Sequence, residues 1–220
     1  MKTVLQSLIV KSRALFLVAA VLTSTVVLAA DAAQQGPGEL IDQAARQVLK
    51  ELDAHRAEMR KDPQKIRNLV DQYLLPHFDT EYAARLVLAK SWRTATPDQR
   101  KRFINAFYQS LLQNYGESLL DFTPDRMTVQ PYRGEPTETT ATVKTEIRRD
   151  NGSRVPVNYS LRKTEAGWKA FDITIEGISY VKSFRTDFGT EIEQKGLDAV
   201  IERLEKQPST KGKPQSKAAA

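Results

Sequence analysis

Residues Gly167 to Gly189, GWKAFDITIEGISYVKSFRTDFG, change from the pattern of a strand to that of a helix, and the rest of the chain is organised around them. Its first half alternates between apolar and polar residues, and Phe171, Ile173 and Ile175 fall on one side of an extended chain. A period of two is typical of a half-buried strand. Gly177 interrupts the pattern, so the sequence predicts a strand that ends there and buries one of its faces.

A helix is predicted directly after Gly177. From Ile178 onward the apolar residues recur every three to four positions, as Val181, Phe184 and Phe188 do. Side chains at this spacing share one face of a helix, and here they would point back toward the sheet. The strand and the helix thus border one apolar space, which we take as the candidate place of function.

The first 30 residues have the pattern of a secretory signal peptide. A basic start precedes an apolar run from Ala14 to Ala30, and small residues follow the run. We expect cleavage between Ala29 and Ala32 and export of the mature chain. Because the sequence contains no cysteine, neither a lipidated cysteine nor a disulfide framework is expected.

The formal net charge of +6 belongs mainly to the two ends of the chain. Three basic residues precede Ala14 and four lie from Lys206 onward, so Asp31–Glu205 is nearly neutral. A nucleic-acid binder would carry its basic excess on the fold, and nucleic acid is therefore excluded as a partner. We expect residues 31–206 to form a single domain, and residues 207–220, which have nothing to bury, to form a flexible tail.

Amphipathic helices are expected before residue 124. They span Gly38–Arg60, Asp62–Pro76, Asp79–Ser91 and a long helix that starts at Thr96, with a further short helix at Leu197–Glu205 near the end. Asp62 and Thr96 are typical N-cap residues followed by proline, and Gln99 completes a capping box with Thr96. From Phe103 onward, large and mostly aromatic side chains recur every four positions along the long helix. This unusually aromatic stripe predicts that a concave surface of the protein packs against it.

After Pro124 the pattern changes to that of strands. Four are expected, at Met127–Tyr132, Thr139–Arg148, Arg154–Thr164 and Trp168–Ile175, and Asp150-Asn151-Gly152 predicts a hairpin between the middle two. The sequence therefore predicts an α+β fold, in which an N-terminal helical layer packs over a twisted antiparallel four-stranded sheet. With the C-terminal helices, these layers would enclose an apolar pocket.

Motifs for catalysis and metal binding are nearly absent. Two histidines and no cysteine supply no ligand set for zinc or another transition metal, and no phosphate loop, dinucleotide fingerprint or nucleophile elbow occurs. His77 precedes Asp79 closely enough to form a base and carboxylate pair, but we interpret it as a loop histidine at a helix end. Asp172 would be the general base if the chain were a cone-shaped α+β enzyme acting on an apolar substrate. We interpret Asp172 as an aspartate on the wet face of its strand, and expect neither catalytic residues nor a cofactor.

Two blocks of the sequence resemble the MlaC family, also called toluene-tolerance or auxiliary transport proteins. They are LLPHFDTEYAARLVLAKSWRTATPDQRKRF, from Leu74 to Phe103, and GWKAFDITIEGISYVKSFRTDF, from Gly167 to Phe188. The matching residues are Pro76, Asp79, Trp92, Arg93, Ala95, Gln99, Arg100 and Phe103 in the first block, and Gly167, Trp168, Asp172, Gly177, Ser179, Arg185 and Phe188 in the second. The resemblance extends over roughly Leu40–Glu205. Tyr180 stands where the family often has leucine and Phe184 where it often has tyrosine, which would alter the shape of the pocket.

This resemblance implies a periplasmic phospholipid carrier and not an enzyme. Such a carrier exchanges lipid with an outer-membrane lipoprotein–porin complex and with the MCE-domain protein of an inner-membrane ABC transporter, and so maintains outer-membrane lipid asymmetry. We expect a monomer that binds phospholipid by two or more acyl chains. The cone-shaped enzyme remains an alternative, as does a periplasmic chaperone whose apolar groove takes a peptide.

The residues expected to contact the acyl chains come from three places. The helical layer would supply Val70, Leu74, Leu86, Phe103, Phe107 and Leu111, the sheet would supply Val143, Val157, Tyr159, Phe171 and Ile173, and Tyr180, Phe184 and Phe188 would lie near the mouth. Arg185 would either contact the lipid head group or form a structural ion pair with a nearby carboxylate. We favour the ion pair, because a guanidinium group at the end of a sheet commonly holds a helix in place.

Overall fold

The computed structural model describes residues 35–135, 138–149 and 151–206. The expected signal peptide, with its cleavage point between residues 29 and 32, and the expected tail at 207–220 lie outside these ranges. So does Asp150 of the expected hairpin. Within the described residues, no helix combines the length and the hydropathy that a membrane crossing requires.

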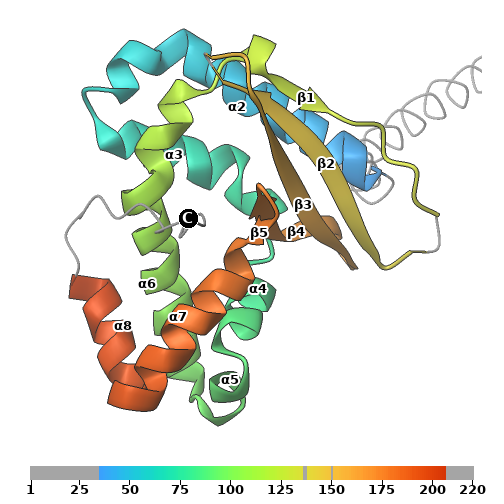
Figure 1. The fold of residues 1–220 in the computed structure, drawn as a ribbon. Helices are drawn as coiled ribbons and strands as arrows, with labels where there is room; N and C mark the ends of the chain where they lie inside the picture. Colours follow the sequence, from blue (N-terminus) through green and yellow to red (C-terminus); the bar gives the residue numbers. More distant parts are fainter. Residues whose placement is uncertain (1–34, 136–137, 150, 207–220) are drawn as a thin grey trace, which may run out of the picture. The chain divides into compact units, whose positions relative to one another are not determined.

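Helices form the first half of the chain, as the α+β prediction requires (Figure 1). They are α2 (Pro37–Met59), α3 (Pro63–Tyr73), α4 (Thr80–Leu88), α5 (Lys90–Thr94) and α6 (Pro97–Tyr115), joined by the short 3₁₀ turns η1 (Leu75–His77), η2 (Gly116–Asp121) and η3 (Pro124–Arg126). Both predicted caps are confirmed. The side chain of Asp62 accepts a hydrogen bond from the backbone N–H of Gln64, and both hydrogen bonds of the Thr96–Gln99 capping box are present.

The single helix expected at Asp79–Ser91 is wrong, because Ala89 divides it into α4 and α5. The backbone of Ala89 has φ 50° and ψ −112°, a conformation that a residue with a Cβ atom rarely adopts. The break turns Trp92 of α5 into the protein interior. There the guanidinium of Arg100 donates a hydrogen bond of 3.0 Å to the Trp92 carbonyl and lies 5.0 Å from the centre of its indole ring.

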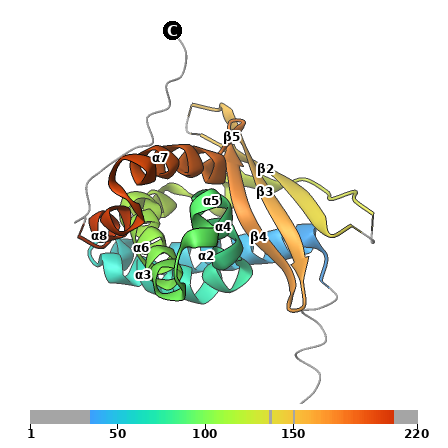
Figure 2. The same cartoon turned by 90° about the horizontal axis from the view of Figure 1, so that it is seen from below.

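The sheet is antiparallel, with strand order β1-β2-β3-β4-β5, and the helices gather on one side of the strands (Figure 2). The strands are β1 (Met127–Val129), β2 (Thr140–Arg148), β3 (Arg154–Thr164), β4 (Gly167–Ile175) and β5 (Ile178–Ser179), and α7 (Tyr180–Lys195) and α8 (Leu197–Lys206) follow. Four strands were expected, and the first is shorter than predicted. The fifth arises because Glu176 and Gly177 both have positive φ, which makes a tight two-residue turn that folds Ile178 back onto β4.

A β-bulge in β4 overturns the predicted alternation at Phe171. Ser160 pairs with Asp172 and the next residue, Leu161, pairs with Ala170, so Phe171 has no partner across the ladder. An extra residue shifts the phase of a strand by one position. Phe171 therefore does not share the face of Ile173, and its ring meets the ring of Tyr82 edge-on at 5.1 Å.

Three separate hydrophobic clusters hold the described residues together. One gathers α4 to α8 around Phe103, one lies between α2, α3 and η2 around Leu52, and one lies between α2 and the sheet around Leu161. Each of these three side chains is 0% exposed. Most domains have one contiguous core. Because this core is divided, large apolar residues lie partly buried at the edges of each cluster.

Candidate functional site

Half-buried apolar side chains lie at the edges of all three clusters. Leu74 at the end of α3 packs against the cluster of Leu52, Leu111 of α6 and Phe184 of α7 pack against that of Phe103, and Tyr159 of β3 packs against that of Leu161. Large apolar residues of a folded domain are usually either buried or scattered singly on the surface. Here they come from the helices and from the sheet, which is the arrangement predicted for a site that takes an apolar ligand.

The sheet contributes a continuous apolar strip to this set. Tyr159 stands opposite Ile173 in the β3–β4 ladder, and Val157 stands opposite Ile175, which in turn pairs with Ile178 of β5. Exposure increases along the strip, from 4% at Val157 to 50% at Ile178. Sequence reasoning missed Ile178 as a site residue, because it assigned this residue to the helix. The Glu176-Gly177 turn was the signal that would have placed it on an edge strand.

Three tyrosines bring hydroxyl groups to the same elements. The rings of Tyr115 at the end of α6 and Tyr180 at the start of α7 meet at 5.9 Å, and Tyr180 meets Phe184 at 6.1 Å. Burial raises the pKa of Tyr159 to about 12. Burial and the nearby Tyr180 and Asp187 raise the pKa of Tyr115 to about 12 as well. Burial also raises the pKa of Tyr180.

None of the three tyrosine hydroxyls forms a hydrogen bond with another described residue. A buried tyrosine usually finds such a partner. The three hydroxyls are therefore available to polar groups of a ligand. Tyr115 was not among the predicted site residues, although it belongs to the aromatic stripe of the long helix.

Several predicted site residues are instead packed into the clusters. Phe103, Phe107 and Phe188 form an aromatic group whose ring centres lie 5.5–5.7 Å apart, and their exposures are 0%, 8% and 6%. The prediction that Phe188 lies near a mouth is therefore wrong, because its side chain is buried within the cluster of Phe103. Phe184 lies at the border of this group, with its ring 5.0 Å from that of Phe107.

The other predicted residues divide in the same way. Val70, Val143 and Val157 are buried, with Val70 in the cluster of Leu52 and Val143 in the cluster of Leu161. Leu74, Leu86, Leu111, Tyr159, Ile173, Tyr180 and Phe184 are half-buried. The predicted residues thus fall into two groups: those that are buried in the clusters and those whose side chains are partly exposed.

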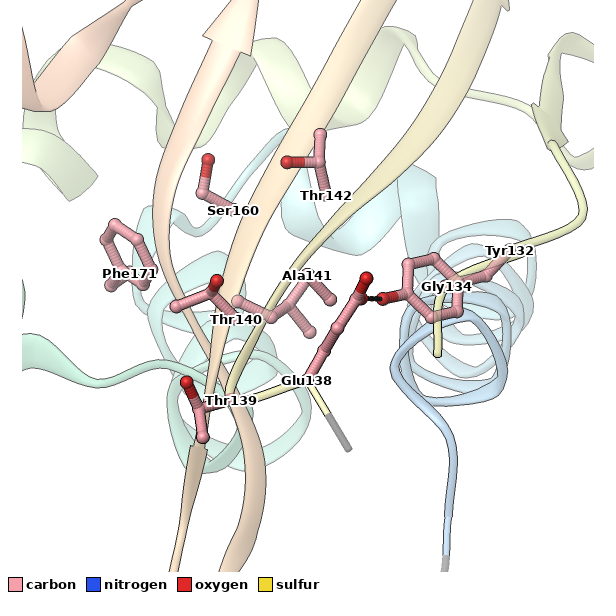
Figure 3. A pocket seen from close by; sticks show the side chains of 10 residues that line it. Tyr132, Gly134, Glu138, Thr139, Thr140, Ala141, Thr142, Ser160 and Phe171 are labelled. Carbon is pink, nitrogen blue, oxygen red and sulfur yellow. Dashed lines mark hydrogen bonds between the residues drawn. The ribbon is translucent and has the colours of Figure 1, made fainter. Parts of the chain in front are cut away.

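A hollow of about 850 Å³ lies over β2, β3 and β4 near the β1–β2 connection (Figure 3). Thr142, Ser160 and Phe171 line it, and so do Tyr132 and Glu138, which are joined by a hydrogen bond from the phenol to the carboxylate. Of the predicted site residues, this hollow contains only Phe171. The bulge that turns Phe171 away from Ile173 explains why it lies with the hydroxyl side chains and not with the apolar set.

Neither candidate base has the surroundings of a general base. Asp172 is only 8% exposed and not on a wet face as predicted, and its carboxylate accepts hydrogen bonds from the Ser179 hydroxyl at 2.5 Å and the Val181 N–H at 3.0 Å. His77 forms no pair with Asp79, whose oxygens accept from Arg162 and from the backbone at the start of α4. Burial and the nearby charge of Lys169 lower the pKa of His77. Among the described residues, no three histidine, aspartate or glutamate side chains are grouped to hold a metal ion.

Comparison with known proteins identifies the family. The family model described as the MlaC protein matches residues 42–206 of this chain. The chain belongs to the MlaC family. Toluene tolerance protein ttg2D of Pseudomonas putida is 28% identical over 76% of this chain and 77% of its own length. The intermembrane phospholipid transport system binding protein MlaC of Haemophilus influenzae is 23% identical over 86% of this chain and 90% of its own length.

A solved structure supports the fold of this MlaC-family chain. The phospholipid-binding protein of Ralstonia solanacearum, determined in complex with a phospholipid, superposes with a TM-score of 0.71 at 24% identity. The match covers 76% of this chain and 93% of the other. The α+β fold predicted from the sequence is therefore confirmed, apart from the additional fifth strand.

The two blocks that resemble the MlaC family contribute mainly to the architecture. In the first, Arg100 holds α5 through the carbonyl and the ring of Trp92. In the second, Asp172 and Ser179 fix the corner between β4 and α7, and the Ser179 hydroxyl also accepts a hydrogen bond from the Lys182 N–H. The strongest sequence signals of the family thus mark the framework that positions the half-buried residues.

Arg185 does not form the ion pair that we favoured. Its side chain is exposed on α7, and no hydrogen bond or ion pair joins it to another described residue. The carboxylates of α7 that form ion pairs are Glu191 and Glu193, which bind Arg203 and Lys90. In this MlaC-family chain, Arg185 therefore remains available to a ligand or partner.

Proposed function

We propose that this chain is a periplasmic phospholipid carrier that holds acyl chains against the half-buried apolar residues of its helices and sheet. The observation that carries the proposal is the set of partly open apolar side chains at the edges of three separate clusters, together with three tyrosine hydroxyls that form no hydrogen bond within the described part of the chain. The name of the Haemophilus influenzae relative, an intermembrane phospholipid transport system binding protein, and the ligand of the Ralstonia solanacearum structure support the same assignment.

The free energy of transfer explains why such a site needs apolar surface and no catalytic motif. Two ordinary acyl chains contain about 30 methylene groups, and exposing each to water costs about 0.8 kcal/mol, or roughly 24 kcal/mol together. A net hydrogen bond contributes only about 1 kcal/mol. The carrier therefore has to replace the membrane interior with apolar side chains, and hydrogen bonds to the head group can only adjust the affinity.

The proposed contact residues follow from the division between packed and half-buried side chains. We assign acyl-chain contact to Leu74, Leu86, Leu111, Tyr159, Ile173, Tyr180 and Phe184, and add Tyr115 and Ile178. The buried residues Val70, Phe103, Phe107, Val143, Val157 and Phe188 would shape the walls. Arg185 would contact the phosphate of the head group, because its guanidinium is exposed and cationic and is paired with no residue in the ranges that the structure describes.

The partners of the carrier follow from the family and remain part of the proposal. The chain would act as an exported monomer, take phospholipid from an outer-membrane lipoprotein–porin complex and deliver it to the MCE-domain protein of an inner-membrane ABC transporter. This exchange would maintain outer-membrane lipid asymmetry. Energy from ATP would enter at the transporter, because the carrier sequence has no nucleotide-binding loop.

Native mass spectrometry of the mature protein, purified from the periplasm without detergent, tests the proposal. We expect a stoichiometric mass increase that organic extraction identifies as phospholipid, and uptake of phospholipid from vesicles by the stripped protein. An Arg185→Ala variant should still load but lose preference for anionic lipid. A protein that carries no phospholipid and takes none from vesicles would overturn the proposal, and a bound peptide in the extract would favour the chaperone alternative.

A further inference from the structure

A second hollow, of about 380 Å³, lies between α2 and β1. Its α2 side includes Ala45, Leu49 and Lys50, and its β1 side consists of Met127 and Val129. None of these residues belongs to the proposed lipid-contacting set. In the sheet, β1 is a terminal strand, and α2 packs beside it (Figure 1).

Among the described residues, no strand pairs with β1 on the side away from β2. Gln130 donates its N–H to the Lys144 carbonyl at 2.9 Å, and in an antiparallel ladder every second residue forms such bonds. Thr128 therefore faces β2, while the N–H and C=O groups of Val129 and the C=O group of Met127 point to the open edge. Among the described residues, no group outside the strand ladders hydrogen-bonds to the N–H or C=O of Val129. An open edge of this kind is a template for another extended chain.

The helix beside the edge supplies a surface for side chains of an added strand. Ala45 and Leu49 are four residues apart on α2 and form one apolar stripe in the hollow. A strand added to β1 would place alternate side chains toward this stripe. Pro131 lacks an N–H group, so the edge offers donors only up to Val129. The hollow therefore fits a short extended segment.

Charges at the rim indicate what the segment carries. Asp42 is paired with Arg46 at 2.7 Å, and Asp53 is paired with Arg56 at 2.9 Å. Lys50 is exposed and has no hydrogen bond or ion pair with another described residue. The uncompensated charge beside the hollow is therefore positive, and an acidic side chain in the added segment would complement it.

We propose that this hollow docks an extended peptide segment of a partner protein, which adds to β1 as a sixth strand. The segment pairs its backbone with Met127 and Val129, places small or medium apolar side chains on Ala45 and Leu49, and places an acidic side chain near Lys50. This docking does not depend on the lipid proposal, because it uses different residues and a different class of ligand. It would let a partner hold the carrier without covering the proposed lipid site.

A selection from a random dodecapeptide library displayed on phage, with the full mature chain as bait, tests the proposal. Ala45→Arg would fill the hollow with a long charged side chain, and Ala54→Arg, at an exposed position of the same helix, is the matched control. We expect enriched peptides with alternating apolar residues and an acidic residue. Their affinity should fall at least tenfold in Ala45→Arg and several-fold in Lys50→Glu, and should be unchanged in Ala54→Arg.

Hydrogen exchange measured by nuclear magnetic resonance locates the bound peptide. Synthetic copies of the enriched peptides should protect the amide of Val129 and leave that of Thr128, which already pairs with β2, unchanged. Lys50→Glu keeps the test decisive if Ala45→Arg does not fold. An absence of enriched peptides, binding that both hollow variants retain, or protection confined to other residues would overturn the proposal. A dimer in sedimentation that Ala45→Arg abolishes would assign the edge to a second copy instead.

Discussion

Removing the carboxylate of Asp172 should destabilise the protein strongly. Its two oxygens accept hydrogen bonds from the Ser179 hydroxyl and the Val181 N–H, and the side chain is only 8% exposed. A hydrogen bond to a charged group contributes about 1.5–3 kcal/mol. Asp172→Ala should therefore lower the free energy of unfolding by about 3–5 kcal/mol, a large fraction of the 5–15 kcal/mol that is usual for a domain.

Conservative variants separate the two hydrogen bonds. Asp172→Asn keeps the shape of the side chain and one acceptor oxygen, so we expect about half of the loss. Ser179→Ala removes one bond to Asp172 and the cap that Lys182 N–H donates to, and should cost about 1–3 kcal/mol. Because both residues share one bond, the double variant with Asp172→Ala should lose less than the sum of the two single losses.

Urea unfolding followed by circular dichroism at pH 7 measures these differences. The variants also test the role of the corner, since it positions Tyr180 and Phe184 at the start of α7. Folded Asp172→Asn at low temperature should take up less phospholipid from vesicles than the unmodified chain. A loss below about 1 kcal/mol in Asp172→Ala would refute the reasoning, because it would mean that the buried carboxylate holds neither partner.

Three further predictions address the backbone, the lipid site and the tyrosines. Ala89→Gly should raise the free energy of unfolding by about 1 kcal/mol in urea titrations, because glycine adopts φ 50° without the strain of a Cβ atom. A lower free energy of unfolding in this variant would show that the backbone at Ala89 is not strained. Ile173→Asp should abolish phospholipid loading in a protein that still folds, while Thr174→Asp, on the opposite face of the same strand, should load normally; equal loading of both would remove Ile173 from the site. The pKa of Tyr115 and of Tyr159 is raised to about 12, so the stability that their neutral phenols provide should be complete below pH 10 and decline as the pH rises toward 12. Thermal unfolding between pH 9 and 12 should show a smaller decline in the Tyr115→Phe/Tyr159→Phe double variant, and an equal decline would count against these two residues.

Sequence patterns and the structure differ most where an alternation or a helix breaks. The caps at Asp62 and Thr96 were predictable, because capping depends on a side chain and the backbone of the next three residues. The bulge at Phe171 was not, since the choice between an ideal strand and a bulged one depends on the register of the neighbouring strand. Likewise, Asp172 is buried because the start of α7 packs over it, and the local sequence pattern around Asp172 does not predict that contact.

The proposed site follows from the sequence as a class of surface and only partly by residue. An excess of large apolar residues at strand and helix spacing indicated an apolar ligand, and the half-buried set contains Leu74, Tyr159 and Phe184 from that prediction. Periodicity shows which side chains face inward, but it does not distinguish a side chain that other helices enclose from one that remains open. Phe188 and Ile178 show the two resulting errors, one packed inside and the other overlooked.

The α+β order of elements, the helix starts and the apolar character of the faces could be read from the sequence, because they depend on interactions between residues close in the chain. The tertiary structure alone decided the break at Ala89, the fifth strand, the bulge at Phe171 and the separation of the interior into three clusters. Those features depend on contacts between segments that are distant in sequence, where packing outweighs local propensities of a few tenths of a kcal/mol. The half-buried residues proposed to contact lipid are a product of that packing.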